Sequence, residues 1–435
     1  MSHGRVRHWW RGGRYGAAVT TPPTSPDAAA PGDDDVAPAP SRPLVAGLRV
    51  EKAVAGGLGL AREPEGRVVL VRGGLPGETV TAEVVEAKER MARAEVVSVQ
   101  VAAPGRVDPP CPEVARGCGG CDLQHADLPT QRAMAREVVV DALARIGKLT
   151  GVVVEDGPEL PGEGFRTSLR CAVEGDRLGF RRHHSREVLA VGDCMVAHPL
   201  VAEVVRDGRF PGAKEVVVRA GARTNEVLVV VHPTWDDVWA PEGARLVGTD
   251  ELESGVRAWI HEEVDDRTFR ISARSFFQAS PEGAEALVDA VRRSLEPSEG
   301  DRLVDLYGGV GLFAGCLGLP QPVLVERSAS STADARVNLA DLDATIVKVA
   351  VERWTPTPAD LVVADPARSG LGAEGVRAVA GTGAPKVALV SCDPAALARD
   401  ARLLVDAGYS LERVELVGMF PHTHHVEAVS TFRKG

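Results

Sequence analysis

The sequence predicts an α/β protein: a mostly parallel sheet in its C-terminal part, preceded by a small β-barrel and a mixed α+β region. From residue 271 to the end, apolar strands alternate with helical segments, the pattern of a parallel sheet with helices on both faces. Residues 43–104 contain short alternating runs separated by glycine turns, as in a small barrel. A chain of 435 residues has room for two or three domains.

The composition is that of an ordinary globular protein, with 44% hydrophobic and 26% charged residues. No apolar run approaches the roughly 18 residues of a membrane span, and the basic N-terminus lacks the apolar core of a secretion signal. We therefore expect a cytoplasmic protein without membrane attachment. The net charge of −11 argues against a protein that coats nucleic acid non-specifically, but it allows a local basic groove.

Four regions follow in order. Residues 1–42 are rich in Pro, Ala and Asp without hydrophobic periodicity, which predicts a disordered tail. The barrel is expected over 43–104 and a central domain with a cysteine cluster over 105–270. Within the central domain, apolar periodicity predicts a helix at 126–150, which we expect to pack on the catalytic domain at 271–435.

Successive apolar runs of the C-terminal domain end on polar or reactive residues, and ligands of α/β sheets bind beyond the carboxyl ends of the strands. These residues are Asp305, Glu326, Asp365 and Cys392. Glycines after Asp305 allow a ligand to approach the backbone, and an acidic residue ending the next strand can hold ribose hydroxyls. Either a nicotinamide cofactor or S-adenosylmethionine fits. The run Gly-Gly-Val-Gly differs from the G-x-G-x-x-G of dinucleotide binders, so an oxidoreductase is the weaker interpretation.

Cys392 lies at a strand end, just before a predicted helix. Buried cysteines more often serve as small apolar residues than as nucleophiles. A helix N-terminus, however, lowers the pKa of a thiol and favours the thiolate. We therefore expect Cys392 to be a nucleophile.

A second group of cysteines, Cys111, Cys118 and Cys121, has the spacing C-x6-C-x2-C. Thiolates this close in a cytosolic chain indicate a metal site rather than disulfides. The fourth ligand is either Cys194 or Cys171, and the position of Cys171 inside an alternating strand favours a core role. Four thiolates suit an iron–sulfur cluster or structural zinc. A nearby arginine run predicts a phosphate-binding patch: Arg166, Arg170, Arg181, Arg182 and Arg186.

Four segments resemble the RNA 5-methyluridine methyltransferases: SFFQ (275–278), DLYGGVG (305–311), SCDPAALARD (391–400) and MFPHTHHVEAV (419–429). The N-terminal barrel is similar to a TRAM domain, so the resemblance covers residues 44–435. It implies a Rossmann-like, class I S-adenosylmethionine-dependent methyltransferase domain preceded by an RNA-binding, OB-like barrel.

The resemblance implies a role for each matching residue. Cys392 would add to carbon-6 of uracil, carbon-5 would attack the methyl group of S-adenosylmethionine, and Glu427 would remove the carbon-5 proton. Contacts to the cofactor or target base would come from Gln278, Tyr307, Glu326 and Asp365. Cys194 matches the distal ligand of a 4Fe–4S cluster, which favours ribosomal over transfer RNA as substrate. The His422–His425 segment would shape the pocket rather than bind metal.

The chain departs from the family pattern at Gly308 and Leu312, where the family has Cys and Asn, and at Ala367, where it has Pro. Any contact of that Asn side chain with the methionine carboxylate is lost or replaced. A non-catalytic RNA-binding iron–sulfur protein is therefore the main alternative. An oxidoreductase leaves the SCDP and HTHHVE segments without a role. We expect a monomer with RNA as its substrate and no obligate protein partner.

Overall fold

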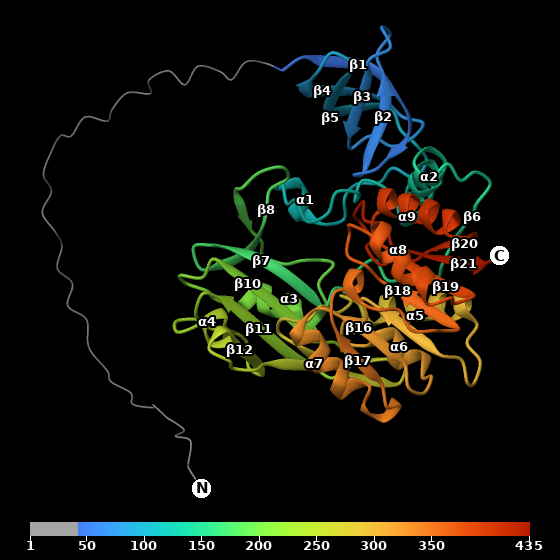
Figure 1. Cartoon of the computed structure of the whole chain (residues 1–435). Helices are drawn as coiled ribbons and strands as arrows, with labels where there is room; N and C mark the ends of the chain where they lie inside the picture. Colours follow the sequence, from blue (N-terminus) through green and yellow to red (C-terminus); the bar gives the residue numbers. More distant parts are fainter. Residues whose placement is uncertain (1–41) are drawn as a thin grey trace, which may run out of the picture. The chain divides into compact units, whose positions relative to one another are not determined.

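The computed structural model describes residues 42–435 (Figure 1). The predicted tail at 1–42 lies outside the described residues, apart from its last residue. Five strands close into a barrel in the order β1-β2-β3-β5-β4. Alternate side chains such as Val69 and Val71 are fully buried inside it, which explains the alternating sequence. The strands are β1 (Leu44–Val54), β2 (Leu58–Arg62), β3 (Val68–Arg72), β4 (Thr79–Ala87) and β5 (Met91–Val101).

A six-stranded sheet follows, in the order β12-β11-β10-β7-β8-β9. Its core includes Phe210, Val216 and Val218, and the apolar face of helix α3 packs against it. A separate hairpin, β13–β14, leads toward the C-terminal domain. The strands are β7 (Ser168–Glu174), β8 (Arg177–Arg181), β9 (Val188–Ala190), β10 (Glu215–Gly221), β11 (Glu226–His232), β12 (Ala244–Gly248), β13 (Trp259–Val264) and β14 (Arg267–Ser272). The helices of this part are α1 (Pro112–Ala115), α2 (Leu128–Arg145), α3 (Pro199–Asp207) and α4 (Thr249–Glu253).

The C-terminal sheet has eight strands in the order β17-β16-β15-β18-β19-β21-β20-β6. The first five run parallel, and the strand order reverses between β15 and β18, where such sheets bind ligands. Its strands are β6 (Val153–Asp156), β15 (Leu303–Leu306), β16 (Val323–Glu326), β17 (Thr345–Lys348), β18 (Leu361–Ala364), β19 (Lys386–Ser391), β20 (Tyr409–Leu416) and β21 (Ala428–Lys434). The helices are α5 (Pro281–Leu295), α6 (Leu312–Leu317), α7 (Ala329–Asn338), α8 (Gly372–Gly381) and α9 (Pro394–Asp406), with short 3-10 turns at Ala340–Leu342 and Val351–Arg353.

Successive residues of the parallel strands pack on opposite faces of this sheet. On β18, Leu361 and Val363 belong to a core with α5 and α6, whereas Val362 and Ala364 belong to a core with α2, α8 and α9. The predicted parallel sheet with helices on both faces is confirmed. The sequence did not indicate β6, because a four-residue strand on the sheet edge is too short to show a period.

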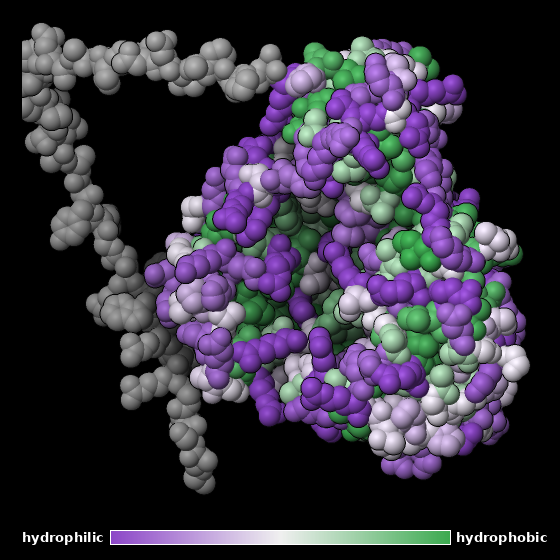
Figure 2. All heavy atoms as spheres, turned by 45° about the horizontal axis from the view of Figure 1, so that its top comes forward, coloured by the Kyte–Doolittle hydropathy of each residue, from purple (hydrophilic) through white to green (hydrophobic). Residues whose placement is uncertain are grey.

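Among the helices of residues 42–435, none is both long and apolar enough to cross a membrane. The space-filling view shows a hollow in the visible face, and its rim is mostly hydrophilic (Figure 2).

Candidate active site and cysteine loop

The four polar strand-end residues lie on adjacent strands at one edge of the C-terminal sheet. Glu326 is the last residue of β16, and Asp305 is the third residue of β15. Asp365 directly follows β18, and Cys392 directly follows β19. Because the four strands are parallel neighbours, the sheet itself brings these side chains to one crevice.

Asp305 is fully buried below the glycine loop. Its Oδ2 accepts a hydrogen bond from the backbone N–H of Ala314 at 3.1 Å, while Oδ1 has no hydrogen-bond partner within residues 42–435. Burial, with the charges of Asp365 and Glu326 acting in the same direction, raises the pKa of Asp305 to about 8. The crevice therefore holds an acceptor without a donor, and the neighbouring carboxylates disfavour the charged form of Asp305.

Glu326 is tied to the glycine loop. One carboxylate oxygen accepts from the Gly309 N–H at 3.2 Å and the other from the Ser328 N–H at 2.5 Å. Gly309 has φ +55, and no heavy atom lies within 4 Å of the position of a Cβ there. The backbone of the loop is thus open to a ligand, with an acidic side chain beside it.

The departures at 308 and 312 have local packing reasons. A Cβ at Gly308 would lie 2.6 Å from the side chain of Leu324 on β16, so this chain has no room for the family's cysteine. Leu312 is 7% exposed and packs in the core with α5. The polar side chain of the family is therefore replaced by an apolar contact.

The register of β19 and β21 places the two residues with proposed chemical roles side by side. Ser391 pairs with Ala428 in this antiparallel ladder. Cys392 and Glu427 are the next residues on the two chains and therefore lie opposite each other. Glu427 is 5% exposed, and its burial together with the charge of Asp365 raises its pKa well above the usual range.

The expectation of a lowered pKa for Cys392 was wrong. Burial raises the pKa of this thiol to about 11, and the charges of Glu427 and Asp365 act in the same direction, whereas Arg368 lowers it. The N-terminus of α9 does not reverse this effect, because the Asp393 carboxylate already caps it, accepting from the Ala396 N–H at 2.8 Å.

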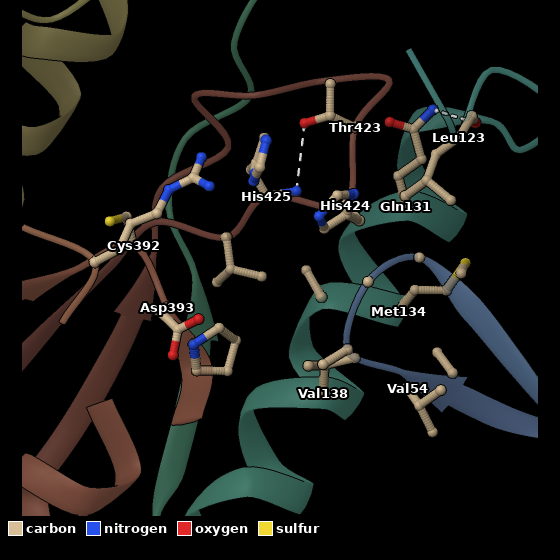
Figure 3. Close-up of a pocket in the computed structure, with 18 residues that line it drawn as sticks. Val54, Leu123, Gln131, Met134, Val138, Cys392, Asp393, Thr423, His424 and His425 are labelled. Carbon is tan, nitrogen blue, oxygen red and sulfur yellow. Dashed lines mark hydrogen bonds between the residues drawn. The ribbon is translucent and has the colours of Figure 1, made fainter. Parts of the chain in front are cut away.

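Cys392 opens into a cavity of about 150 Å³. A cavity of this size accommodates a benzene-sized ring. Cys392 and His425 lie on one side, and Met134 and Val138 of α2 lie on the other (Figure 3). Arg368, the 423–426 turn and the turn between β1 and β2 complete the lining, so the N-terminal barrel contributes to the same cavity.

The other two predicted contacts lie on loops. Tyr307, at φ +59, donates its hydroxyl to Glu352 at 3.2 Å. Gln278 is half-buried between β14 and α5. Its loop is fixed by Asp334, which accepts from Ser275 Oγ at 2.6 Å and from the Ser272 N–H at 2.9 Å. Asp334 is fully buried, and no pattern in the single sequence distinguishes it from an ordinary helical acid.

The thiols of the cysteine loop (residues 105–125) lie close enough to influence one another and Cys194. Burial and the charges of Cys118 and Cys111 raise the pKa of Cys121 to about 11. Burial and the charges of Cys121 and Cys118 raise that of Cys194 to about 12. Cys171 is 1% exposed in the core of the central sheet, and Cys194 is the cysteine that acts on it. Nowhere in residues 42–435 do three His, Cys, Asp or Glu side chains converge closely enough for one metal ion.

The arginine run adjoins the cysteine loop. The Gly119 N–H donates to the Arg181 carbonyl at 3.1 Å, and the backbones of Cys118 and Arg182 form an isolated antiparallel β-bridge. Glu187 pairs with Arg182 at 2.8 Å, and Glu215 pairs with Arg170, whereas Arg181 and Arg186 are exposed. Part of the predicted phosphate-binding patch is thus neutralised within the protein.

Comparisons with known proteins agree with this architecture. A TRAM domain model matches residues 48–97. An RNA methyltransferase of Streptomyces avermitilis, itself uncharacterised, is 37% identical over 86% of this chain and 95% of its own. The 23S rRNA (uracil(1939)-C(5))-methyltransferase RlmD of Chromohalobacter salexigens is 32% identical over 88% of both chains.

Among solved structures, the tRNA (uracil-54, C5)-methyltransferase of Pyrococcus abyssi, in complex with S-adenosyl-L-homocysteine, has a TM-score of 0.66. It is 23% identical and covers 88% of this chain and 99% of that chain. This likeness and the TRAM match confirm the predicted fold class, a class I methyltransferase domain preceded by a TRAM barrel.

Proposed function

Because the chain belongs to the family of RNA methyltransferases that includes the 23S rRNA uracil-C5 enzymes, we propose that it methylates carbon-5 of a uridine in ribosomal RNA. The observation that carries this proposal is that the register of β19 and β21 brings Cys392, which lines a cavity of ring size, opposite Glu427, whose charge acts on the Cys392 thiol. Ribosomal RNA is favoured over transfer RNA because the relatives that act on it exceed 30% identity over most of the chain.

The crevice suits S-adenosylmethionine, which carries a sulfonium and an ammonium group. Asp305 offers an unpaired acceptor oxygen, and Glu326 lies beside the open Gly309 backbone. The charges of Glu326 and Asp365 help to raise the pKa of the buried Asp305. A cationic ligand would relieve this repulsion and supply the missing donor. Glu326 would accept from the ribose hydroxyls.

The chemistry follows from the neighbouring side chains. The Cys392 thiolate adds to carbon-6 of the ring, and the electron pair of the carbon-5–carbon-6 double bond moves toward carbon-5. S-adenosylmethionine, when bound, supplies the methyl group that carbon-5 acquires and keeps the electron pair of the broken sulfur–carbon bond. Glu427 then takes the carbon-5 proton, the ring double bond re-forms, and the Cys392 sulfur leaves with its electron pair.

The raised pKa values fit this order of events. A carboxylate with a raised pKa is a stronger base, as removal of a carbon-bound proton requires. In the free protein, burial holds both Cys392 and Glu427 toward their neutral forms. A cation in the adjoining crevice would lower both pKa values, which links formation of the thiolate to a loaded site.

We also propose that Cys111, Cys118, Cys121 and Cys194 hold an iron–sulfur cluster. The proposal is supported by the charges of neighbouring cysteines, which help to raise the pKa values of Cys118, Cys121 and Cys194. A single zinc ion needs sulfurs about 2.3 Å from one centre. An iron–sulfur cluster is held by cysteine thiolates alone, which suits a set of four cysteines.

The test is incubation of anaerobically purified protein with methyl-labelled S-adenosylmethionine and total RNA from a strain that lacks the gene. Label is expected in 5-methyluridine of the large ribosomal RNA. Label in transfer RNA would show that the substrate is transfer RNA rather than ribosomal RNA. No incorporation together with no binding of S-adenosylmethionine would favour a non-catalytic RNA-binding protein.

The Glu427→Gln variant tests the chemistry separately. It retains the Cys392 thiol but lacks the base, so methylated RNA is expected to remain attached to the protein in denaturing gels. The double variant Cys392→Ala/Glu427→Gln is the matched control and should form no such complex. Free methylated product at the normal rate from Glu427→Gln would contradict the role of this residue.

A further inference from the structure

The cysteine loop is bonded directly to the turn that precedes Glu427. The backbone N–H groups of Asp122 and Leu123 both donate to the carbonyl of His422, at 3.0 and 2.9 Å. Asp122 immediately follows Cys121, and His422 begins the histidine-rich segment that leads to Glu427. Backbone hydrogen bonds therefore join two segments that are some 300 residues apart in the sequence. The second of them carries the proposed base, Glu427.

The side chain of Asp122 makes a second connection. One carboxylate oxygen accepts from the backbone N–H of His424 at 2.9 Å, and the other contacts Nδ1 of the His424 ring. The carboxylate is only 15% exposed. A carboxylate that accepts two hydrogen bonds from one residue fixes both its backbone and its ring. The Asp122 side chain thus determines where His424 lies.

Gln131 of α2 links the same two segments from the other side. Its amide group donates to the carbonyls of Leu123 at 3.2 Å and Ala126 at 2.8 Å, and its oxygen accepts from the His422 N–H at 2.7 Å. Gln131 is 7% exposed, so these bonds form away from bulk water, where a lost partner is costly. The close-up shows Gln131, Leu123 and His424 on one side of the cavity that Cys392 faces (Figure 3).

Residues 122–124 of the cysteine loop are also connected to its cysteines. The N–H of Cys111 donates to the side-chain oxygen of Gln124 at 3.0 Å, and Cys121 directly precedes Asp122 in the chain. A change in the arrangement of the thiols therefore passes through only one or two residues before it reaches Asp122.

We propose that Asp122 is a positioning residue that couples the cysteine loop to Glu427, so that the group held by the cysteines sets the position of the base. This inference rests on the proposed methylation, because it assigns Glu427 its role. His424 and Glu427 are three residues apart on one turn, and a misplacement of about 1 Å costs a reaction roughly 100-fold. The cysteine-bound group then acts on catalysis without touching the substrate.

The experiment compares Asp122→Ala, Asp122→Asn and the control Asp108→Ala, which changes an exposed acid of the same loop region. Asp122→Ala is expected to lower turnover about 10–100-fold. The KM for S-adenosylmethionine and the iron content should stay unchanged, and methylated RNA should accumulate on Cys392, because proton removal is the step that slows. Asp122→Asn keeps an acceptor for the His424 N–H and should recover part of the loss.

Hydrogen exchange of the amides at 421–427 gives a readout that does not depend on activity. It should rise in Asp122→Ala and also in wild-type protein treated with an iron chelator, while Asp108→Ala should match the untreated wild type. Unchanged exchange after removal of the metal would overturn the coupling, as would a loss of turnover without the covalent complex. If the wild type forms no 5-methyluridine, the proposed function fails, and the exchange result still decides whether loop and turn are coupled.

Discussion

The two halves of the candidate active site are held in place by different means. Cys392 and Glu427 lie on neighbouring strands, and the backbone ladder between β19 and β21 sets their separation. The turn that leads to Glu427 is held by two backbone hydrogen bonds to the His422 carbonyl and by side chains, chiefly Asp122 and Gln131. A ladder of many backbone bonds tolerates the loss of any one side chain, whereas a contact made by one carboxylate does not. Substitutions in the two halves should therefore have different consequences.

The largest effect is expected at the strand end. Cys392→Ala should lower methylation by at least about 10³-fold, because it removes the covalent route, while S-adenosylmethionine binding measured by calorimetry is retained. The control is Cys316→Ala, which removes a buried core thiol outside the cavity and should affect stability more than turnover. Methylation that persists in Cys392→Ala would contradict the assignment of the nucleophile.

The next effect concerns the cysteine loop. Cys194→Ser is expected to lose most of its iron, because its thiol lies with Cys121 and Cys118, whereas Cys171→Ser should keep it. Elemental analysis of the purified proteins gives the iron content. Equal loss in both variants would place Cys171 among the ligands, and zinc in place of iron would change the identity of the bound group.

The sequence predicted the parts of the site that follow from the alternation of apolar strands and helices and from the positions where the strands end. The ends of β15, β16, β18 and β19 were found because apolar runs stop at polar residues. The pairing of Cys392 with Glu427 was not predictable from the pattern alone, since the register of β21 depends on tertiary packing. The pKa of Cys392 was predicted in the wrong direction, because the sequence shows the helix that follows but not the burial.

Side chains that act over long sequence distances were not found at all. Asp334 and Gln131 look like ordinary polar residues of a helix, and only the fold shows that they hold the Gln278 loop and the 422–424 turn. Asp122 was also missed, because the sequence draws attention to Cys121 beside it and gives no sign of the contact with His424.

A smaller effect is expected for Asp305→Asn in the absence of cofactor. A buried acid with its pKa raised to about 8 holds its proton more tightly in the folded than in the unfolded state. The stability of the wild type should therefore fall as the pH rises from about 4 to 8, and the variant should show a smaller fall, because the raised pKa values of Asp365 and Glu427 contribute to it as well. Urea unfolding of the wild type at pH 6 and pH 9 should give free energies of unfolding that differ by roughly 1–3 kcal/mol, because each pKa unit corresponds to about 1.4 kcal/mol. The same variant should bind S-adenosylmethionine more weakly, because an acceptor is lost. A wild type equally stable at both pH values would argue against a buried acid in the crevice.

The smallest effect is expected for Arg368, and it tests whether this arginine acts on the charge of Cys392 or by contact with the RNA. Arg368 lowers the pKa of Cys392, so Arg368→Gln should raise that pKa further above the ordinary thiol range. Below its pKa, the thiolate fraction grows about tenfold with each pH unit, so the rate of both proteins should rise with pH. Because both pKa values lie well above neutrality, the variant should be a few-fold slower than the wild type by the same factor throughout the neutral range, and its Cys392 should react more slowly with iodoacetamide. Arg377→Gln, which changes an exposed arginine paired with Glu374 on α8, is the control. Equal rates of alkylation of Cys392 in the two proteins, together with slower methylation by the variant, would instead mean that Arg368 acts through contact with the RNA.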